Sequence, residues 1–463
     1  MKKLGFLFLL FATLLHSQNS SVVKVMDDVT NQEFEFKEVK NLDNGSVIKD
    51  AQVDNVIYKK IGNKYYKRVI PNKTVDVTWF GTNSDAIQKA VDFVSLDLGP
   101  WKRAQYSIYL PEGTYTIDKP IKIINTEGIR ISGGGIGTIL KIKKDTHISS
   151  VLDLNGVAYG VFENFYFAGD TNSSCDSFIN MYWADKKSDV QAKNLPQRSS
   201  TQNSFTNIRN LSGKFKNAVL IDGHNQNDVS MWSNVAFLGD WNPSEKQFYQ
   251  SAFYIGDGQA GNNLLHDFRN VYLVGVKSGY VFAGSSGTIT GGGCTNIDTY
   301  IVRNNPNQTL WISGSRLEHT KRIYRNEGAH DGIHEFPENV TFQSLWYSGS
   351  GATQKHFQPA EDGVLIFHGG GTMNIIGSSI MYLPDNYKMK IKLSGAMNDN
   401  FHNALNIIGS NIQGKFDEIF LVDKWAKASV NVVGSNEIGG SLGTKMGKHV
   451  HQWQKDFNYS SGK

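Results

Sequence analysis

Apolar and polar positions alternate in a short unit that recurs along most of the chain. One version reads F-x-N-Φ-x-Φ, where Φ is apolar, and a second version has the form of NIIGSSIM. The units begin at Phe162, Phe205, Trp232, Phe268, Cys294, Trp311, Phe342, Asn374, Asn406 and Asn431. Alternation with period 2 places one face of each strand inward and the other in water. The irregular steps between the units indicate a solenoid with loops of variable length and exclude a propeller with uniform blades.

Two further local features follow from the same pattern. Asparagines and serines inside the units are expected at turns or in hydrogen-bonded ladders between coils. Before the first unit, Ile87, Ala90, Val91 and Val94 recur at helical spacing. This spacing predicts a short amphipathic helix from Asp85 to Val94.

The segment that follows this helix carries a recognisable signature. It reads SIYLPEGTYTIDKPIKI from Ser107 and GIRISGGGIGTILKI from Gly128. Together with the helix, it resembles the N-terminal signature of the pectate-lyase-like superfamily, particularly the branch shared with phage tailspike enzymes. The resemblance covers about Val75 to Ile142. It implies an all-β fold, a right-handed single-stranded parallel β-helix with an N-terminal capping helix, but no single chemistry, since the superfamily contains lyases, hydrolases, epimerases and non-catalytic adhesins.

Four segments are expected along the chain. Residues 1–18 have two lysines, an apolar run from Leu4 to Leu15 and a small polar end, which is typical of a secretory signal peptide. Residues 19–74 form a small β-rich extension, residues 75–440 form the β-helix domain, and residues 441–463 form a C-terminal tail. The mature protein is therefore expected to be secreted or periplasmic, with no membrane span.

Composition and charge narrow the classes of partner. The formal net charge is +4 over 463 residues, which is too small an excess to indicate nucleic-acid binding. That charge is compatible with an acidic polysaccharide as the substrate. The two cysteines, Cys175 and Cys294, are able to form one bridge or to stay buried thiols. Because their units lie several coils apart, free thiols are favoured.

Aligning the units by their first apolar residue predicts which side chains stack on the outer surface. Four consecutive coils, about 4.8 Å apart, then present Tyr272, Asp298, Arg316 and Trp346. Glu318 is expected to point the same way as Arg316, with His319 and Lys321 just after it. His266 is expected to enter the same coil as Tyr272 from the preceding loop.

This set of residues suits a lyase that acts on uronic acids. Such an enzyme removes the proton next to a carboxylate while a cation neutralises that carboxylate. Arg316 suits neutralisation through its planar fork, and His319, Tyr272 or His266 would serve as the base. Trp346 would stack on a sugar face, and Lys321 would contact the substrate.

Two alternatives stay open. A glycoside hydrolase would use Asp298 and Glu318 as its two carboxylates, although the N-T-D, D-D, G-H-G and R-I-K motifs of polygalacturonase-type hydrolases are not intact. The second alternative is a non-catalytic β-helix that binds glycans or serves in adhesion. The sequence has no aspartate cluster like that of calcium-dependent pectate lyases; no cofactor is certain, and a need for Ca²⁺ is left open. The oligomeric state is also open, and the resemblance to tailspikes makes a trimer conceivable beside a monomer.

Overall fold

The structure is a computed structural model of the chain. It describes residues 21–27, 30–97, 101–183, 199–222, 227–244, 248–256, 263–304, 309–326, 338–349, 358–360, 362–368, 371–381, 391–394, 403–413, 420–422, 428–434 and 450–455. The expected signal peptide, residues 1–18, lies outside these ranges.

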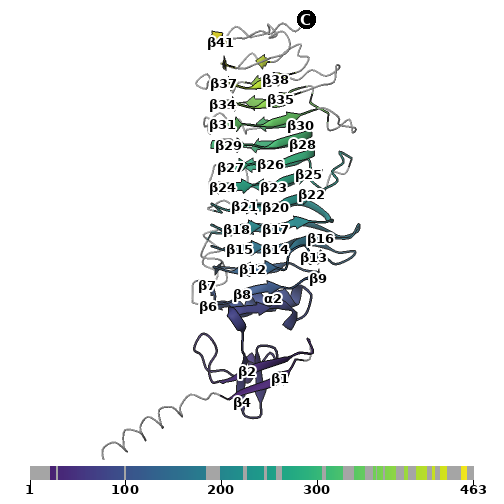
Figure 1. Cartoon of the computed structure of the whole chain (residues 1–463), viewed down its shortest axis with the longest axis vertical. Coiled ribbons are helices and arrows are strands. Elements are labelled where there is room, and N and C mark those ends of the chain that lie inside the picture. Colours follow the sequence, from purple (N-terminus) through teal and green to yellow (C-terminus); the bar gives the residue numbers. More distant parts are fainter. Residues whose placement is uncertain are drawn as a thin grey trace, which may run out of the picture.

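The chain winds into an elongated rod of stacked coils, each of which contributes strands to three faces (Figure 1). We call these faces sheets 1, 2 and 3. Strands of neighbouring coils pair in parallel on every face. The fold is a right-handed parallel β-helix, which confirms the fold class predicted from the sequence.

Sheet 1 is a continuous 14-stranded sheet. Its strands are β5 (Thr74–Asp76), β8 (Ser107–Leu110), β12 (Arg130–Gly133), β15 (Val161–Glu163), β18 (Ser204–Thr206), β21 (Met231–Ser233), β24 (Asn263–Arg269), β27 (Ser285–Thr290), β29 (Thr309–Ser313), β31 (Glu338–Gln343), β34 (Gly371–Ile376), β37 (Asn403–Ile408), β40 (Ala428–Val433) and β41 (Val450–Lys455). The pairing of β40 with β41 carries parallel strands past residue 440, where the sequence analysis placed the end of the β-helix.

Sheets 2 and 3 are joined because two long strands, β28 (Gly293–Asn304) and β30 (Arg316–Asn326), run across both. The other strands of sheet 2 are short: β9 (Gly113–Ile117), β13 (Thr138–Ile142), β16 (Tyr166–Ala168), β19 (Arg209–Asn210), β22 (Ala236–Leu238), β25 (Tyr272–Val274), β32 (Trp346–Ser348), β35 (Ser379–Met381) and β38 (Asn411–Gln413). The other strands of sheet 3 are β10 (Ile121–Ile124), β14 (His147–Asn155), β17 (Ser174–Tyr182), β20 (Lys214–Asp222), β23 (Ser251–Ile255), β26 (Ser278–Ala283), β33 (Leu365–His368), β36 (Ile391–Ser394) and β39 (Phe420–Val422).

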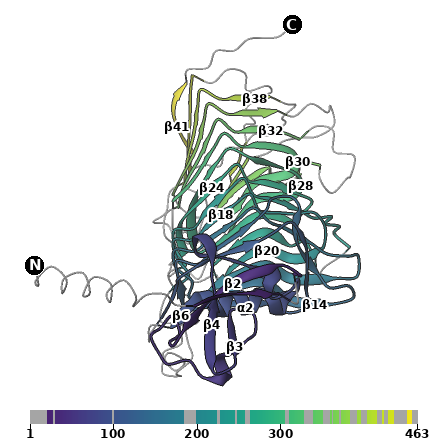
Figure 2. The ribbon, with the colours of Figure 1, turned by 60° about the horizontal axis from the view of Figure 1, so that its bottom comes forward.

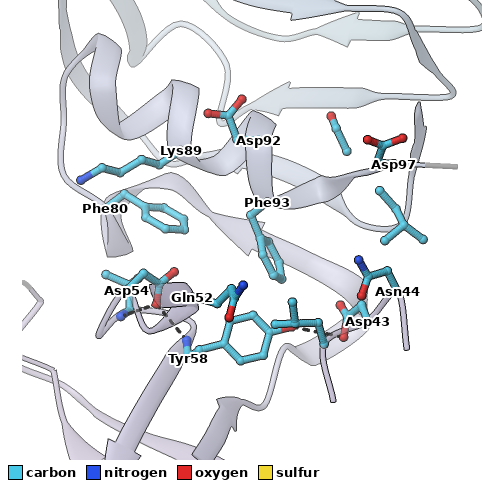
Figure 3. Close-up of a pocket in the computed structure, with 14 residues that line it drawn as sticks. Asp43, Asn44, Gln52, Asp54, Tyr58, Phe80, Lys89, Asp92, Phe93 and Asp97 are labelled. Atoms are coloured by element: carbon cyan, nitrogen blue, oxygen red, sulfur yellow. Dashed lines mark hydrogen bonds between the residues drawn. The ribbon is translucent and has the colours of Figure 1, made fainter. Parts of the chain in front are cut away.

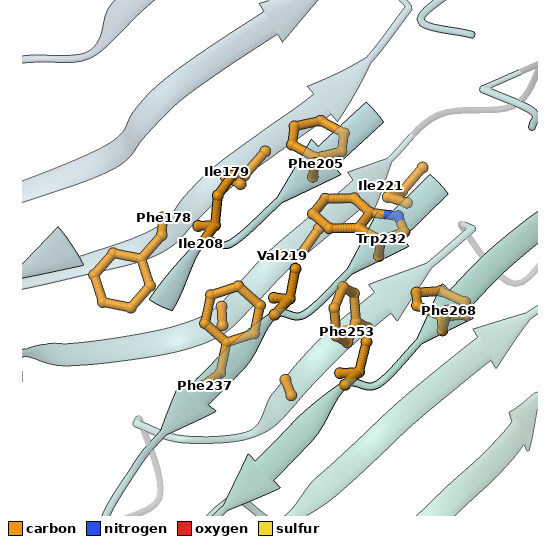
Figure 4. Packing of buried hydrophobic residues seen from close by; sticks show 14 of the residues in the cluster. Phe178, Ile179, Phe205, Ile208, Val219, Ile221, Trp232, Phe237, Phe253 and Phe268 are labelled. Carbon is orange, nitrogen blue, oxygen red and sulfur yellow. The ribbon is translucent and has the colours of Figure 1, made fainter. Parts of the chain in front are cut away.

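The first apolar residues of the early units stack in the centre of the rod (Figure 4). The rings of Phe162 and Phe205 lie 5.0 Å apart, and those of Phe205 and Trp232 lie 3.9 Å apart, both nearly parallel. All three side chains are fully buried. The stack therefore confirms the inward direction that period-2 alternation predicts for these positions.

The unit asparagines form the turn between sheets 1 and 2. Asn164, Asn207, Asn234 and Asn270 all adopt left-handed backbone conformations, with φ between 52° and 62°. The amide of Asn207 donates to the side-chain oxygen of Asn164 at 2.9 Å. Asparagine tolerates this conformation better than other residues with a side chain, and the predicted turns and ladders are confirmed.

The N-terminal end of the rod is closed by the predicted helix, α2 (Ser84–Val94). The side chain of Asn83 caps it by accepting from the backbone amide of Ala86 at 2.9 Å. Ile87, Ala90, Val91 and Val94 are buried against the first coil, which confirms the predicted helix. In the part of the chain that the structure describes, no helix is long and apolar enough to cross a membrane.

A small antiparallel sheet lies beside this cap (Figure 2). Its order is β1-β2-β4-β3, with β1 (Val22–Met26), β2 (Glu33–Val39), β3 (Tyr58–Ile61) and β4 (Lys64–Arg68). Short elements complete the region: the 3-10 turns Asp50–Gln52, Pro71–Lys73 and Val77–Trp79, and a sheet of β6 (Ser95–Asp97), β7 (Lys102–Ala104) and β11 (Thr126–Glu127). Arg68 joins the two parts, because its buried guanidinium pairs with Asp27 and stacks on Trp79 at 4.5 Å.

Both cysteines are buried free thiols. Burial raises the pKa of each thiol, that of Cys294 to about 12. The expectation of free thiols is confirmed, and neither sulfur carries the charge of a reactive thiolate at neutral pH.

Candidate functional site

The predicted row of outward-facing side chains lies on sheet 2, but one of its four predicted residues is wrong. Parallel pairing aligns Tyr272 with Gly293, Gly293 with Arg316, and Arg316 with Trp346. Gly293, not Asp298, therefore occupies the row between Tyr272 and Arg316. The alignment was wrong because Ile289 pairs with Phe268, so the counterpart of the first apolar residue in this coil is Ile289 and not Cys294.

Arg316 is already engaged by its neighbours in the row. Its guanidinium lies 2.5 Å from a carboxylate oxygen of Glu318 and 4.6 Å from the ring centre of Trp346. The arginine thus occupies the face of the indole and has its own anionic partner, although its side chain is 67% exposed. Burial and the nearby charge of Glu318 raise the pKa of Tyr272, which makes this phenol a weak candidate for a base.

His266 does not reach this row. It lies in β24 on sheet 1, with its side chain in the core 6.4 Å from the ring of Phe268. Burial lowers the pKa of His266 to about 3, and neither ring nitrogen has a hydrogen-bond partner among the described residues. The expectation that His266 serves as a surface base was wrong, because β24 extends back to Asn263 and alternation turns this side chain inward.

A corner separates the remaining predicted residues into two groups. Asn296 and His319 adopt left-handed conformations where β28 and β30 pass from sheet 2 to sheet 3. Glu318 lies before this corner, whereas Asp298 and Lys321 lie after it. Asp298 and Glu318 therefore lie on opposite sides of the corner and do not form the pair expected for a hydrolase. Asp298 instead accepts from Arg322 at 3.0 Å and lies 3.8 Å from Lys321.

Asp298 lines a groove on the outer face of sheet 3, with a volume of about 220 Å³. The floor is a row of small polar residues on successive coils. It consists of Asn217, Ser251, Ser278 and Thr299, aligned by parallel pairing. The groove therefore runs along the rod axis for three coil spacings, about 14 Å, which is the direction and length that a short stretch of a linear polymer needs.

The two walls of the groove differ in chemistry. One wall consists of Gln250, Lys277 and Asp298 on successive coils. The other consists of Tyr254, Val281, Val302 and Arg325, again in register. Cations thus stand on both walls, while Asp298 is the one carboxylate among the described residues that line the groove.

Arg322 closes one end of the floor row, next to Thr299. Its guanidinium bridges two carboxylates, with Asp298 at 3.0 Å and Asp362 at 2.7 Å. Burial acts to raise the pKa of Asp362, but the bond and charge of Arg322 outweigh it and leave that pKa lowered. At this end of the groove, hydrogen bonds therefore hold the charged groups of Arg322, Asp298 and Asp362 in place.

Within the described ranges, no three His, Cys, Asp or Glu side chains are grouped so that they could hold a metal ion. The described residues therefore offer no candidate set of carboxylate ligands for Ca²⁺.

Sequence reasoning missed Lys277 and Tyr254, and it assigned Arg325, which lies in strand β30, to the solvated charges of a loop after Arg316. Each lies in a different coil, outside the recurrent unit from which the alignment was built. The one available signal was the long strand that follows each unit, whose outward positions line sheet 3.

No protein-family model matches the chain, and no curated protein matches it significantly. Among solved structures, the chain is similar to the enzymatically active domain of tailspike protein 4 from bacteriophage CBA120, with a TM-score of 0.48 and 10% identity over 92% of this chain; it spans 52%, about half, of the tailspike chain. It is also similar to the catalytic unit of a GH87 α-1,3-glucanase from Streptomyces thermodiastaticus (TM-score 0.48, 10% identity, 82% and 74% of the two chains). A third is the A-module of the Azotobacter vinelandii mannuronan C-5 epimerase AlgE4 (TM-score 0.38, 13% identity, 79% and 100%). By its fold, the chain belongs to the class of right-handed parallel β-helix proteins.

Proposed function

We propose that the chain is an exported enzyme of the pectate-lyase-like superfamily that cleaves a uronic-acid-containing polysaccharide by β-elimination. The polysaccharide lies along the groove on sheet 3. The GH87 glucanases among the similar solved structures act on a polysaccharide, which accords only with the coarser part of this proposal, an enzyme active on polysaccharides.

The observation that carries the proposal is the charge of the groove. Lys277 and Arg325 face it from opposite walls, while Asp298 is its single described carboxylate and is bound by Arg322. A uronate approaching the floor therefore meets cations on both sides. Positive charge fixed around a substrate carboxylate stabilises the carbanion that forms when the neighbouring proton leaves.

The groove also offers a group for proton transfer. Tyr254, whose side chain carries a phenolic hydroxyl, lies on the same wall as Arg325. In the proposed reaction, Arg325 and Lys277 neutralise the uronate. The ionised oxygen of Tyr254 takes the proton from the carbon next to the carboxylate, and the resulting hydroxyl returns a proton to the leaving oxygen. The bond between the ring and the leaving oxygen breaks as the double bond forms, so that no water is consumed.

A hydrolase on the same groove is the second candidate. It would use Asp298 and Asp362, the two carboxylates that Arg322 bridges, since hydrolysis needs a pair of carboxyl groups. Arg322 pairs with both groups and holds the pKa of Asp362 below its usual value, so Asp362 does not suit the general acid that hydrolysis also needs. This is the reason to rank the lyase first.

The test is to incubate the full chain with a panel of acidic and neutral polysaccharides. A lyase releases unsaturated sugars whose conjugated double bond gives a new ultraviolet absorbance, whereas a hydrolase releases reducing ends without that absorbance. A non-catalytic binding protein releases neither. Reducing ends without absorbance, or no product at all, would refute β-elimination.

Single substitutions then test the site. Lys277→Ala and Arg325→Ala should each lower kcat/KM by about a hundredfold or more, because each removes a charge that neutralises the uronate. The matched control is Arg316→Ala, which removes an exposed arginine from sheet 2 and should leave activity nearly unchanged. If Arg316→Ala abolishes activity while the groove variants stay active, the site lies on sheet 2.

A further inference from the structure

A second cavity lies at the N-terminal end of the molecule, between the small antiparallel sheet and helix α2 (Figure 3). Its volume is about 590 Å³, within the range of about 300–1,000 Å³ that is usual for small-molecule sites. The groove on sheet 3 shares none of its residues. It is therefore a separate candidate site.

Aromatic rings form opposite sides of this cavity. Phe80 and Phe93 come from the side of α2, and Tyr58 comes from the small sheet (Figure 3). Phe93 is held in place because it stacks on Tyr106 at 5.3 Å and meets the edge of Tyr58 at 6.4 Å. Phe93 and Tyr58 are thus held by their ring contacts before any ligand arrives.

Two of the acidic residues in the cavity are already committed. One oxygen of Asp54 accepts three backbone amides, those of Val56, Ile57 and Tyr58. Asp43 accepts from Lys67 and from the hydroxyl of Tyr106. These two carboxylates position the loops of the small sheet.

The cavity also contains two side-chain amides, which are uncharged, and two further carboxylates. The side-chain oxygen of Gln52 accepts from the amide of Lys49, and that of Asn44 accepts from Ser46. Each amide NH₂ is then left to donate. Asp92, which accepts from the side-chain amide of Gln88 at 3.0 Å, and Asp97 add negative charge at the helix side. Lys89 is the one lysine among the described residues that line the cavity.

We propose that this cavity binds uncharged sugar residues of the polysaccharide, as an accessory site away from the groove. The proposal rests on the proposed function, because it assumes that the chain acts on a glycan. Aromatic faces pack against the C–H face of a sugar ring, and amides and carboxylates bond its hydroxyls. The excess of carboxylates repels a uronate, so the cavity and the groove select different sugars of one heteropolysaccharide.

The test measures binding of short neutral oligosaccharides of glucose, mannose, galactose and xylose to the full chain, with oligogalacturonate as the acidic probe. At least one neutral probe should bind, and Phe80→Ala should lower the affinity for that probe at least tenfold. Gln52 is exposed and does not support the core. Gln52→Ala should also lower the affinity for the same probe. The control Tyr159→Ala removes an exposed ring on the β-helix and should leave binding unchanged.

The outcomes separate this inference from the proposed function. If no neutral probe binds, or if binding survives both Phe80→Ala and Gln52→Ala, the accessory site is refuted whatever the catalytic result. Neutral binding that persists in Lys277→Ala places the site outside the groove, as proposed. Loss of neutral binding in Lys277→Ala assigns it to the groove and overturns the inference.

Discussion

The buried imidazole of His266 makes the stability of the β-helix depend on pH in a calculable way. The side chain is 1% exposed and lies 6.4 Å from the ring of Phe268, and neither ring nitrogen has a hydrogen-bond partner in the part of the chain that the structure describes. Removing it from water disfavours the charged form, so burial lowers the pKa of His266 from 6.5 to about 3 in the folded protein. In the unfolded chain the ring is hydrated and titrates near its ordinary value.

The sign and size of this pH dependence follow from the difference in proton binding between the unfolded and folded states. Between pH 6.5 and 3 the unfolded state binds a proton that the folded state does not, so the free energy of unfolding falls as the pH falls. Each pH unit below 6.5 contributes about 1.4 kcal/mol. From pH 7 to pH 5, this one residue therefore removes about 2 kcal/mol of stability, which is a large share of the usual margin of about 5–15 kcal/mol.

The perturbation is His266→Leu, which keeps an apolar side chain of similar size in the core. Urea unfolding at pH 7 and pH 5 should show that the variant loses about 2 kcal/mol less than the parent chain over this interval. If unfolding has several steps, the step that contains β24 is the one to compare. The control is His147→Leu, which removes a histidine that is about half exposed and should leave the pH dependence as it is. An unchanged difference between pH 7 and pH 5 in His266→Leu would falsify this account of the buried ring.

Two further predictions concern the stability of the coils. Glu338 is fully buried, pairs with Arg303 at 2.5 Å and accepts from Tyr324; Glu338→Ala should cost about 3–5 kcal/mol in urea unfolding because it strands a buried charge. The double variant Arg303→Met with Glu338→Leu should cost less, and an equal cost would contradict the role of the unpaired charge. At the turn of Asn270, where φ is 52°, Asn270→Val should cost about 1–3 kcal/mol while Asn270→Gly stays within a few tenths. Equal midpoints for the two Asn270 variants would show that the turn carries no such constraint.

The amino-acid sequence by itself determined the elements whose signal is local. Period-2 alternation fixes which side of a strand is buried, and this was enough to place Phe162, Phe205 and Trp232 in one stack. The helical spacing of Ile87, Ala90, Val91 and Val94 was enough to predict α2. Both patterns span a few residues, so they are readable without knowledge of the rest of the fold.

The stacking register was decided only by the tertiary structure. The coil that contains β28 turns at Gly291 and Gly292 instead of at an asparagine, and no unit of the usual form marks its start. Hydrogen bonds to the neighbouring coils decide that Gly293, and not Asp298, faces Arg316. A residue five places away in sequence thereby moves past a corner and onto another face of the rod.

The groove is the clearest case of a site that no local pattern contains. Gln250, Lys277 and Arg325 each come from a different coil, separated by loops of unequal length. Only the pairing of strands about 4.8 Å apart brings them beside Asp298. The sequence carries the alternation that points each side chain outward, whereas the non-local pairing between coils decides which of them share a surface.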